Sequence, residues 1–163
     1  MEELSAEDKA RYARHLTLPQ IGVDGQSQLK ASKVFCVGAG GLGSPALLYL
    51  AAAGIGHLTI IDDDNIERSN LQRQILHADE DVGASKAESA MLRLRELNPS
   101  ISVEVHPQRL TSENALRLIE GHDLVIDGTD NIPTRYLVND TCELLRIPWV
   151  YGSIYRFEGQ VSV

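Results

Sequence analysis

The sequence predicts an α/β protein with a doubly wound, mostly parallel sheet and an N-terminal helical arm. Short apolar runs at 34–37, 58–61 and 124–127 have the composition of buried parallel strands. Helical patterns separate these runs, and such alternation gives right-handed parallel crossovers. A glycine-rich turn over 38–43 directly follows the first run. We therefore expect the arm over 1–32 and a nucleotide-binding domain over 33–163.

The arm is predicted to begin with a helix that Ser5 caps and that ends before Pro19. Asp8 occupies the third helical position of a capping box, away from the apolar face of this helix. Residues 22–30 are expected to form a loop with a short helix over 26–29. No linker separates the arm from 33, so we expect the arm to pack on the domain or on a partner.

The glycine turn and its flanks form the opening βαβ unit of a Rossmann-like fold. Gly38 allows a sharp turn after the strand, Gly40 allows close approach of a ligand, and Gly43 allows close helix–sheet packing. Ser44 is expected to cap the following helix, which stops at Gly54. The free N–H groups of such a helix start favour an anion such as phosphate.

An acidic residue follows the second apolar run. Asp62 lies 19 residues after Gly43, close to the spacing at which an acid meets ribose hydroxyls. The alternative interpretation is a glycine turn that binds no ligand. It is less favoured, because the turn is accompanied by both strands, the helix and the acid.

The remaining elements follow the same alternation. We expect helices over 85–97, 113–119 with a Thr111 cap, and 133–145, and strands over 101–105, 124–127, 149–151 and from 160 to the end of the sequence. Ligands bind outside the carboxyl ends of parallel strands. That edge is predicted to bring together the glycine turn, Asp62 and residues 128–131.

Length and composition restrict the class of protein. The 163 residues fit one domain with a sizeable core, and a net charge of −8 argues against nucleic acid as a partner. No apolar stretch is long enough for a membrane span and no targeting segment is visible, so we expect a cytoplasmic protein without a membrane partner. Cys36 and Cys142 are expected to be buried free thiols, since no Cys-x-x-Cys pair exists.

Cations near the predicted nucleotide edge form a second polar group with Asn70 and Gln74. Arg73 offers a planar fork and Lys86 a point charge, which suits a triphosphate. The alternative, that both cations are solvated surface charges, is equally compatible with their spacing.

Asp130 and Asn131 follow a buried strand at the same edge. A carboxylate at 130 can hold Mg²⁺ against the phosphates of a nucleotide. Because Pro133 opens a helix, Asp130 is alternatively a helix cap, a role that Asn131 can also fill.

The chain resembles the MoeB/ThiF/HesA family, the adenylyltransferases related to ubiquitin-activating enzymes. The resemblance runs from Arg11 to about Gln160, and its most specific pieces are Ser-Asn-Leu-Gln-Arg-Gln over 69–74 and Thr-Asp-Asn over 129–131. Within the family, the arm and the 70–77 stretch are most similar to the molybdopterin-synthase branch.

The resemblance implies roles for individual residues. Asp62 would hold the ribose of ATP, Asp130 would bind Mg²⁺, and Arg14 would reach the triphosphate of a neighbouring subunit in a homodimer. Asn70, Arg73 and Lys86 would bind phosphates and stabilise charge in the transition state. The implied nucleotide-binding residues are Gly38, Gly40, Gly41, Gly43, Asp62, Asp64, Ser69, Asn70, Leu71, Gln72, Arg73, Lys86, Asp130 and Asn131.

The implied reaction is attack by the C-terminal carboxylate of a small ubiquitin-like sulfur-carrier protein, ending in Gly-Gly, on the α-phosphate of ATP. Family members continue beyond the position of Val163, where they carry two Cys-x-x-Cys zinc pairs. We therefore expect a C-terminally incomplete chain without the family's zinc site. Cys142 is expected to be a core residue rather than a catalytic thiol, because its neighbours are apolar.

Two rival functions remain open. A nicotinamide-dependent oxidoreductase uses the same glycine fingerprint, but backbone N–H groups usually meet its pyrophosphate, which leaves Arg73 and Lys86 without a purpose. A nucleotide-binding module without turnover is the non-catalytic alternative. Thiamine-pathway adenylyltransferases and tRNA-modifying dehydratases share most of these residues within the family.

Overall fold

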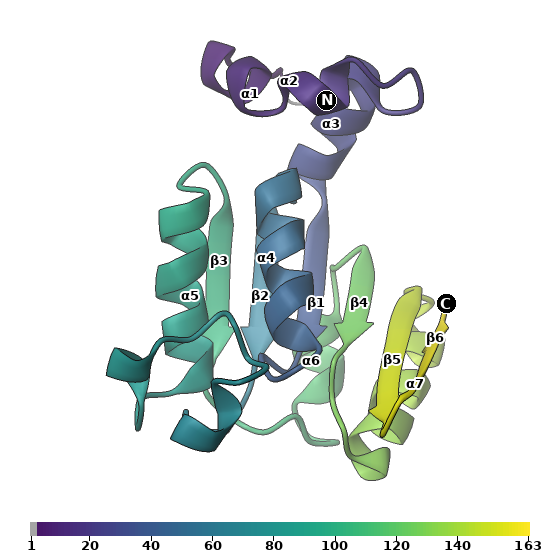
Figure 1. Ribbon diagram of the computed structural model, residues 1–163. Helices are drawn as coiled ribbons and strands as arrows, with labels where there is room; N and C mark the ends of the chain where they lie inside the picture. Colours follow the sequence, from purple (N-terminus) through teal and green to yellow (C-terminus); the bar gives the residue numbers. More distant parts are fainter. Residues whose placement is uncertain (1–2) are drawn as a thin grey trace.

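The computed structural model describes residues 3–163. Its strands are β1 (Lys33–Val37), β2 (His57–Ile61), β3 (Ser102–His106), β4 (Leu124–Asp127), β5 (Trp149–Tyr155) and β6 (Glu158–Ser162). They form one six-stranded sheet in the order β3-β2-β1-β4-β5-β6 (Figure 1). β1 to β5 are parallel, and only β6 runs antiparallel, beside β5. The doubly wound, mostly parallel sheet expected from the sequence is confirmed.

Helices cover both faces of this sheet. α4 (Gly43–Ala53) and α5 (Lys86–Leu97) lie on one face, and α6 (Ala115–Ile119) and α7 (Ile132–Leu145) lie on the other (Figure 1). Successive strand residues point to opposite faces. In β1, Val34 and Cys36 accordingly join the core under α4 and α5, while Phe35 and Val37 join the core under α6 and α7.

The N-terminal arm consists of α1 (Ala6–Arg11), α2 (Ala13–Leu16) and α3 (Gly22–Ala31) and lies at the end of the sheet where β1 begins (Figure 1). It packs on the rest of the chain through specific contacts. Asn98 Nδ2 donates to the Tyr12 hydroxyl at 2.8 Å, and Gln26 Nε2 donates to the carbonyl of Ala53 at 2.9 Å. The division into an arm over 1–32 and a domain over 33–163 stays a prediction.

One expectation for the arm is wrong, and another is confirmed with an additional contact. Residues 22–31 form a ten-residue helix rather than a loop. The segment has little apolar periodicity, and buried polar contacts stabilise it instead. Gln26, for example, is fully buried and hydrogen-bonds with His15 and with the carbonyl of Ala53. Asp8 completes the predicted capping box with Ser5, but it is 95% buried and pairs with Lys30 at 2.9 Å.

Two helix starts also differ from expectation. Ser44 does not cap α4, which begins at Gly43; its hydroxyl instead donates to the Ala39 carbonyl. α6 begins at Ala115 rather than at 113, because residues 112–114 form a turn. Thr111 contacts the helix start through its backbone carbonyl, which accepts from the Ala115 N–H. By contrast Gly54 ends α4 in the left-handed conformation, as predicted.

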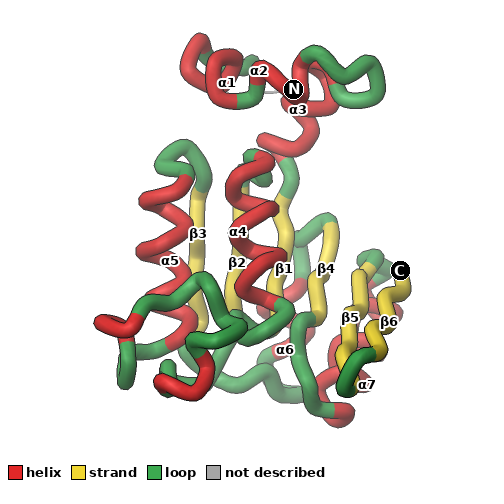
Figure 2. The backbone as a smooth tube through the Cα atoms, viewed as in Figure 1, coloured by secondary structure: helices red, strands yellow, loops and turns green. Residues whose placement is uncertain are grey.

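The connection between β2 and α5, at the carboxyl edge of the sheet, is long and contains short helical turns (Figure 2). Two 3₁₀ turns, Arg68–Asn70 and Asp79–Asp81, lie between β2 and α5. Among the described residues 3–163, no helix is long and apolar enough to cross a bilayer.

Close packing at Gly43 predicts a large effect on stability. A Cβ at this position would lie 2.0 Å from the backbone oxygen of Gly38, and backbone cannot move aside as a flexible side chain does. Gly43→Ala is therefore expected to destabilise the fold by about 3 kcal/mol. Thermal unfolding of Gly43→Ala and Gly40→Ala measures this, since a Cβ at Gly40 has its nearest neighbour at 3.6 Å. Equal melting temperatures for the two variants would contradict the steric argument.

Candidate active site

A cleft of about 1070 Å³ lies at the carboxyl ends of β1, β2, β4 and β5. Segments far apart in sequence line it, including the glycine turn, residues 61–65 and residues 128–132. The edge that the sequence analysis identified therefore forms one concave site, which is where ligands bind in doubly wound sheets.

The glycine turn forms one wall of the cleft through Gly38, Gly40 and Gly41. Gly38 has a φ of 92°, a conformation that favours glycine. Ala39, between the two lining glycines, is fully buried. Among the described residues, no hydrogen bond uses the N–H groups of Gly40 and Gly41, so both remain available to an anion.

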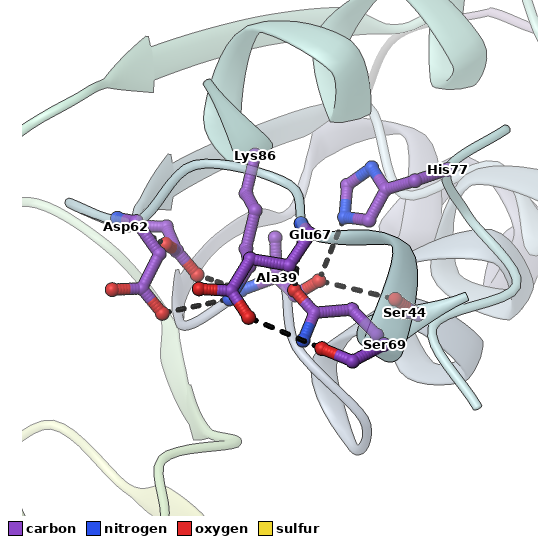
Figure 3. Close-up of polar contacts among 9 residues, drawn as sticks. Ala39, Ser44, Asp62, Glu67, Ser69, His77 and Lys86 are labelled. Atoms are coloured by element: carbon purple, nitrogen blue, oxygen red, sulfur yellow. Dashed lines mark hydrogen bonds and ion pairs between the residues drawn. The ribbon is translucent and has the colours of Figure 1, made fainter. Parts of the chain in front are cut away.

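Asp62 contacts the glycine turn directly. One carboxylate oxygen accepts the Ala39 N–H at 2.8 Å, and the other accepts the Asp64 N–H at 2.9 Å (Figure 3). Burial raises the pKa of the Asp62 carboxyl, against the lowering effect of these two hydrogen bonds and of Lys86. Each carboxylate oxygen keeps an unused lone pair, with which Asp62 can accept a ligand hydroxyl.

Lys86 is 95% buried, yet it is one of the residues that line the cleft. It lies at the start of α5 and donates to the exposed Asp64 carboxylate at 2.7 Å. The solvated-surface interpretation is wrong for this lysine. A buried ammonium with one exposed partner can exchange that partner for a ligand phosphate.

Asn70 and Arg73 lie in the segment that connects β2 to α5, and both line the cleft. Asn70 Oδ1 accepts from the Glu67 N–H at 3.1 Å, which fixes the 3₁₀ turn. The exposed Arg73 side chain lies over the turn, with its Cδ and Nε 3.4 Å from a Cβ built on Gly41. Its guanidinium is thus placed beside the unused N–H groups.

Asp130 and Asn131 form the opposite wall of the cleft. Asn131 caps α7 by accepting the Thr134 N–H at 3.0 Å, so the cap belongs to Asn131 and not to Asp130. In the described part of the chain, no hydrogen bond or ion pair uses the Asp130 carboxylate, which is exposed. An unengaged carboxylate in a cleft is a ligand that suits Mg²⁺.

The charges that line the cleft also fit a bound cation. Acidic side chains slightly outnumber basic ones: the acids are Asp62, Asp63, Asp64, Glu67 and Asp130, and the bases are Arg73, Lys86, Arg109 and Arg135. A polyanionic ligand would meet repulsion at such a site unless a divalent cation came with it.

Some predicted site residues lie outside the cleft. Gly43 packs against Gly38, and Ser69, Leu71 and Gln72 do not contribute to its lining. Ser69 instead donates to Glu67 Oε2 at 3.1 Å. Arg14 is exposed on α2, at the opposite end of the sheet (Figure 1). A ligand in this cleft is thus beyond the reach of Arg14 of the same chain.

Three residues around the cleft, two of them buried, were not identified as site residues by the sequence analysis. Arg135 Nη2 donates to the carbonyl of Thr129 at 2.6 Å and so fixes the loop that carries Asp130. Asp127 receives two hydrogen bonds from Thr129, while burial raises the pKa of its carboxyl. His77 contacts the carbonyl of Ala39 from below the glycine turn. Sequence spacing gave no signal for these contacts: the His77 contact joins segments 38 residues apart, and the Asp127 and Arg135 contacts within residues 127–135 follow no periodic pattern.

Cys142 is buried in the core under α6 and α7, as expected. Burial raises the pKa of its thiol to about 11, which keeps it protonated at neutral pH. A protonated, enclosed thiol is a poor nucleophile, so the structure assigns Cys142 to packing.

Comparison with known proteins identifies what this arrangement is similar to. The model of the ThiF family matches residues 12–163. The probable adenylyltransferase/sulfurtransferase MoeZ of Mycobacterium tuberculosis is 56% identical over 160 residues, which are 98% of this chain and 41% of that protein. The sulfur carrier protein adenylyltransferase of Thermus thermophilus is 54% identical over 157 residues, 96% of this chain and 58% of that protein. The chain thus spans about half the length of the relatives it matches.

A solved structure has the same fold with a nucleotide bound. The E. coli tRNA N6-threonylcarbamoyladenosine dehydratase TcdA, in complex with ATP, superimposes with a TM-score of 0.85 at 30% identity. The match covers 91% of this chain and 60% of that one. The Rossmann-like architecture expected from the sequence is therefore shared with an ATP-binding protein.

Proposed function

The chain belongs to the ThiF family, and we propose that it acts as an ATP-dependent adenylyltransferase for a small ubiquitin-like sulfur-carrier protein. One observation carries the proposal: the glycine turn, Arg73, Lys86 and Asp130 meet in a single cleft. Relatives that are 54% and 56% identical bear adenylyltransferase names, whereas the dehydratase is 30% identical. These names support adenylation over the oxidoreductase and the dehydratase alternatives.

In the proposed reaction a carboxylate oxygen of the carrier's C-terminal glycine attacks the α-phosphorus of ATP. The bond between that phosphorus and the α,β-bridging oxygen breaks, and pyrophosphate leaves with the electron pair. The products are an acyl-adenylate and pyrophosphate, so no side chain forms a covalent bond. The residues of the cleft position the reactants and neutralise charge, which are the main contributions of a protein to phosphoryl chemistry.

Each cleft residue has a proposed part in this step. The free N–H groups of Gly40 and Gly41 bind phosphate oxygens, and Asp62 accepts a ribose hydroxyl. Lys86 leaves Asp64 for the triphosphate, and Arg73 with Asn70 binds the phosphates that depart. Asp130 holds Mg²⁺, which supplies positive charge to the phosphates. Ser69, Leu71 and Gln72 support the turn that presents Asn70 and Arg73.

We further propose that the protein is a homodimer whose two sites each take Arg14 from the partner. Arg14 is exposed at the far end of its own sheet, so it can serve a site only in a second chain. The face of the sheet that α4 and α5 cover carries two exposed apolar side chains, Tyr49 on α4 and Leu92 on α5. These side chains are available for association with a second chain.

Ligand choice tests the proposed function most directly. Mg²⁺-ATP is expected to bind at least about tenfold more tightly than NAD, because a triphosphate uses Arg73, Lys86 and Asp130 together. Isothermal calorimetry with each ligand, with and without Mg²⁺, measures this. Tighter binding of NAD, or ATP binding that is indifferent to Mg²⁺ and to Lys86→Ala, would contradict the adenylyltransferase proposal.

A further inference from the structure

The buried carbonyl of Ala39 has two hydrogen-bond donors aimed at it from different segments. Ser44 Oγ donates from α4 at 3.1 Å, and His77 Nε2 lies 3.1 Å away on the side of the 70–77 segment (Figure 3). The N–H of the same residue donates to Asp62. Both polar groups of Ala39 are therefore held, although the residue itself is fully buried and does not line the cleft.

The geometry of the peptide bond connects this contact to the cleft. The Ala39 carbonyl and the Gly40 N–H belong to one planar trans peptide, so they point in opposite directions. A carbonyl held toward His77 and Ser44 directs the Gly40 N–H away from them. Gly40 lines the cleft and its N–H is unused, so this direction is the one that an anion needs.

The chemistry of the acceptor determines which nitrogen of His77 carries the proton. A carbonyl can only accept, so Nε2 must be protonated in the neutral ring. Nδ1 lies 3.0 Å from Ser89 Oγ, which can donate to it. In the structure the single hydroxyl proton of Ser89 donates to Asp81 Oδ2 at 3.0 Å, so it must turn to Nδ1 when the ring is in the neutral Nε2–H form, and Asp81 Oδ2 then keeps the Ala78 N–H. Because burial lowers the pKa of His77, the neutral Nε2–H form is the one that holds the turn at neutral pH.

We propose that His77 is a positioning residue for ATP, which fixes the glycine turn through Ala39 so that the Gly40 N–H meets a phosphate oxygen. The proposal rests on the proposed adenylyltransferase function and adds to it a residue that is buried behind the nucleotide site. His77 is 7% exposed and does not line the cleft, so any effect on ATP must pass through the turn.

A matched pair of substitutions separates positioning from packing. Gln at position 77 places an amide donor near the position of Nε2, and Asn places one near Nδ1, within reach of Ser89 but short of Ala39. His77→Asn is expected to raise the Kd and KM for Mg²⁺-ATP about tenfold, the effect of one lost hydrogen bond, with kcat and the KM for the carrier protein nearly unchanged. His77→Gln is expected to stay within about threefold of wild type.

Ser44→Ala provides a second variant that removes the other donor and leaves His77 in place. Ser44→Ala alone is also expected to weaken ATP binding. Combined with His77→Asn, it is expected to weaken binding by more than the sum of the two single effects, because the Ala39 carbonyl has no donor in the double variant. Calorimetry gives the Kd values, and melting temperatures identify any variant that is unfolded.

Three further outcomes test the proposal. Imidazole ¹⁵N spectra of wild type, assigned by loss of the signal in His77→Gln, are expected to show the Nε2–H form; an Nδ1–H form would overturn the proposal. Equal loss of ATP affinity in His77→Asn and His77→Gln, or none in either, would reduce His77 to a packing residue while the proposed function stands. Failure of wild type to bind ATP would overturn the proposed function itself.

Discussion

Replacing Asp130 with alanine is expected to reduce carrier-dependent exchange of labelled pyrophosphate into ATP by at least about a thousandfold. The exposed carboxylate is unengaged in the described structure and stands in a cleft where acids slightly outnumber bases. Without it the cleft has lost its proposed Mg²⁺ ligand, and the triphosphate would meet the remaining acids unshielded. The fold should not change, because Asn131 rather than Asp130 caps α7.

Asp63→Ala is the matched control for this prediction. Asp63 is another exposed acid of the same cleft, so its removal changes the charge equally without removing the proposed metal ligand. Exchange should remain within about fivefold of wild type. Asp130→Ala should also lose the dependence of ATP binding on Mg²⁺ in calorimetry. Wild-type exchange in Asp130→Ala would show that the metal is held elsewhere.

The sheet was predictable because each strand signal is local. Runs such as 34–37 are apolar throughout, which only a strand buried on both faces requires, and the glycine turn specifies the conformation that follows. α3 could not be predicted in the same way. Its stability comes from contacts to residues distant in sequence, such as Gln26 with Ala53, which leave no periodic pattern.

In the candidate site, too, the positions with a local sequence signal were predictable and those that depend on contacts in the folded chain were not. The positions of Asp62, Lys86 and Asp130 at the cleft were predictable, because Asp62 directly follows β2, Lys86 begins α5 and Asp130 lies three residues after β4, all at the carboxyl edge of the sheet. Ser44 was misassigned as a cap because a serine before an apolar helix has that usual role, whereas here its hydroxyl contacts Ala39. His77 was not identified because its proposed role depends on the direction of one buried carbonyl, which no sequence pattern reports.

Arg14→Ala is expected to reduce exchange by about a thousandfold or more while the protein folds and dimerises normally, because an arginine supplied across an interface can contribute that much to phosphoryl transfer. Arg14 is exposed on α2, and in the described residues its side chain forms no hydrogen bond or ion pair. Its removal should therefore not affect the stability of its own chain. Guanidinium suits the task because it stays charged and can bind phosphate through two N–H groups.

Position explains why the effect should arise in trans. The arm packs at the end of α4 where Tyr12 meets Gly54, whereas the glycine turn lies at the other end of this 11-residue helix. At 1.5 Å per residue the two ends are about 16 Å apart. Within a closed two-fold dimer, by contrast, each arm can lie at its neighbour's cleft.

Mixing the two inactive variants distinguishes the models. With free subunit exchange, about half of all dimers contain one Arg14→Ala and one Asp130→Ala chain, and one of their two sites combines an intact Arg14 with an intact Asp130. About a quarter of wild-type activity should therefore return. As a control, wild type mixed equally with a chain carrying both substitutions should keep about a quarter of full activity if Arg14 acts in trans, and about half if it acts in cis. No recovery in the first mixture, with exchange shown by native mass spectrometry, would mean that Arg14 does not serve the neighbouring site, and the shared-site dimer would have to be abandoned.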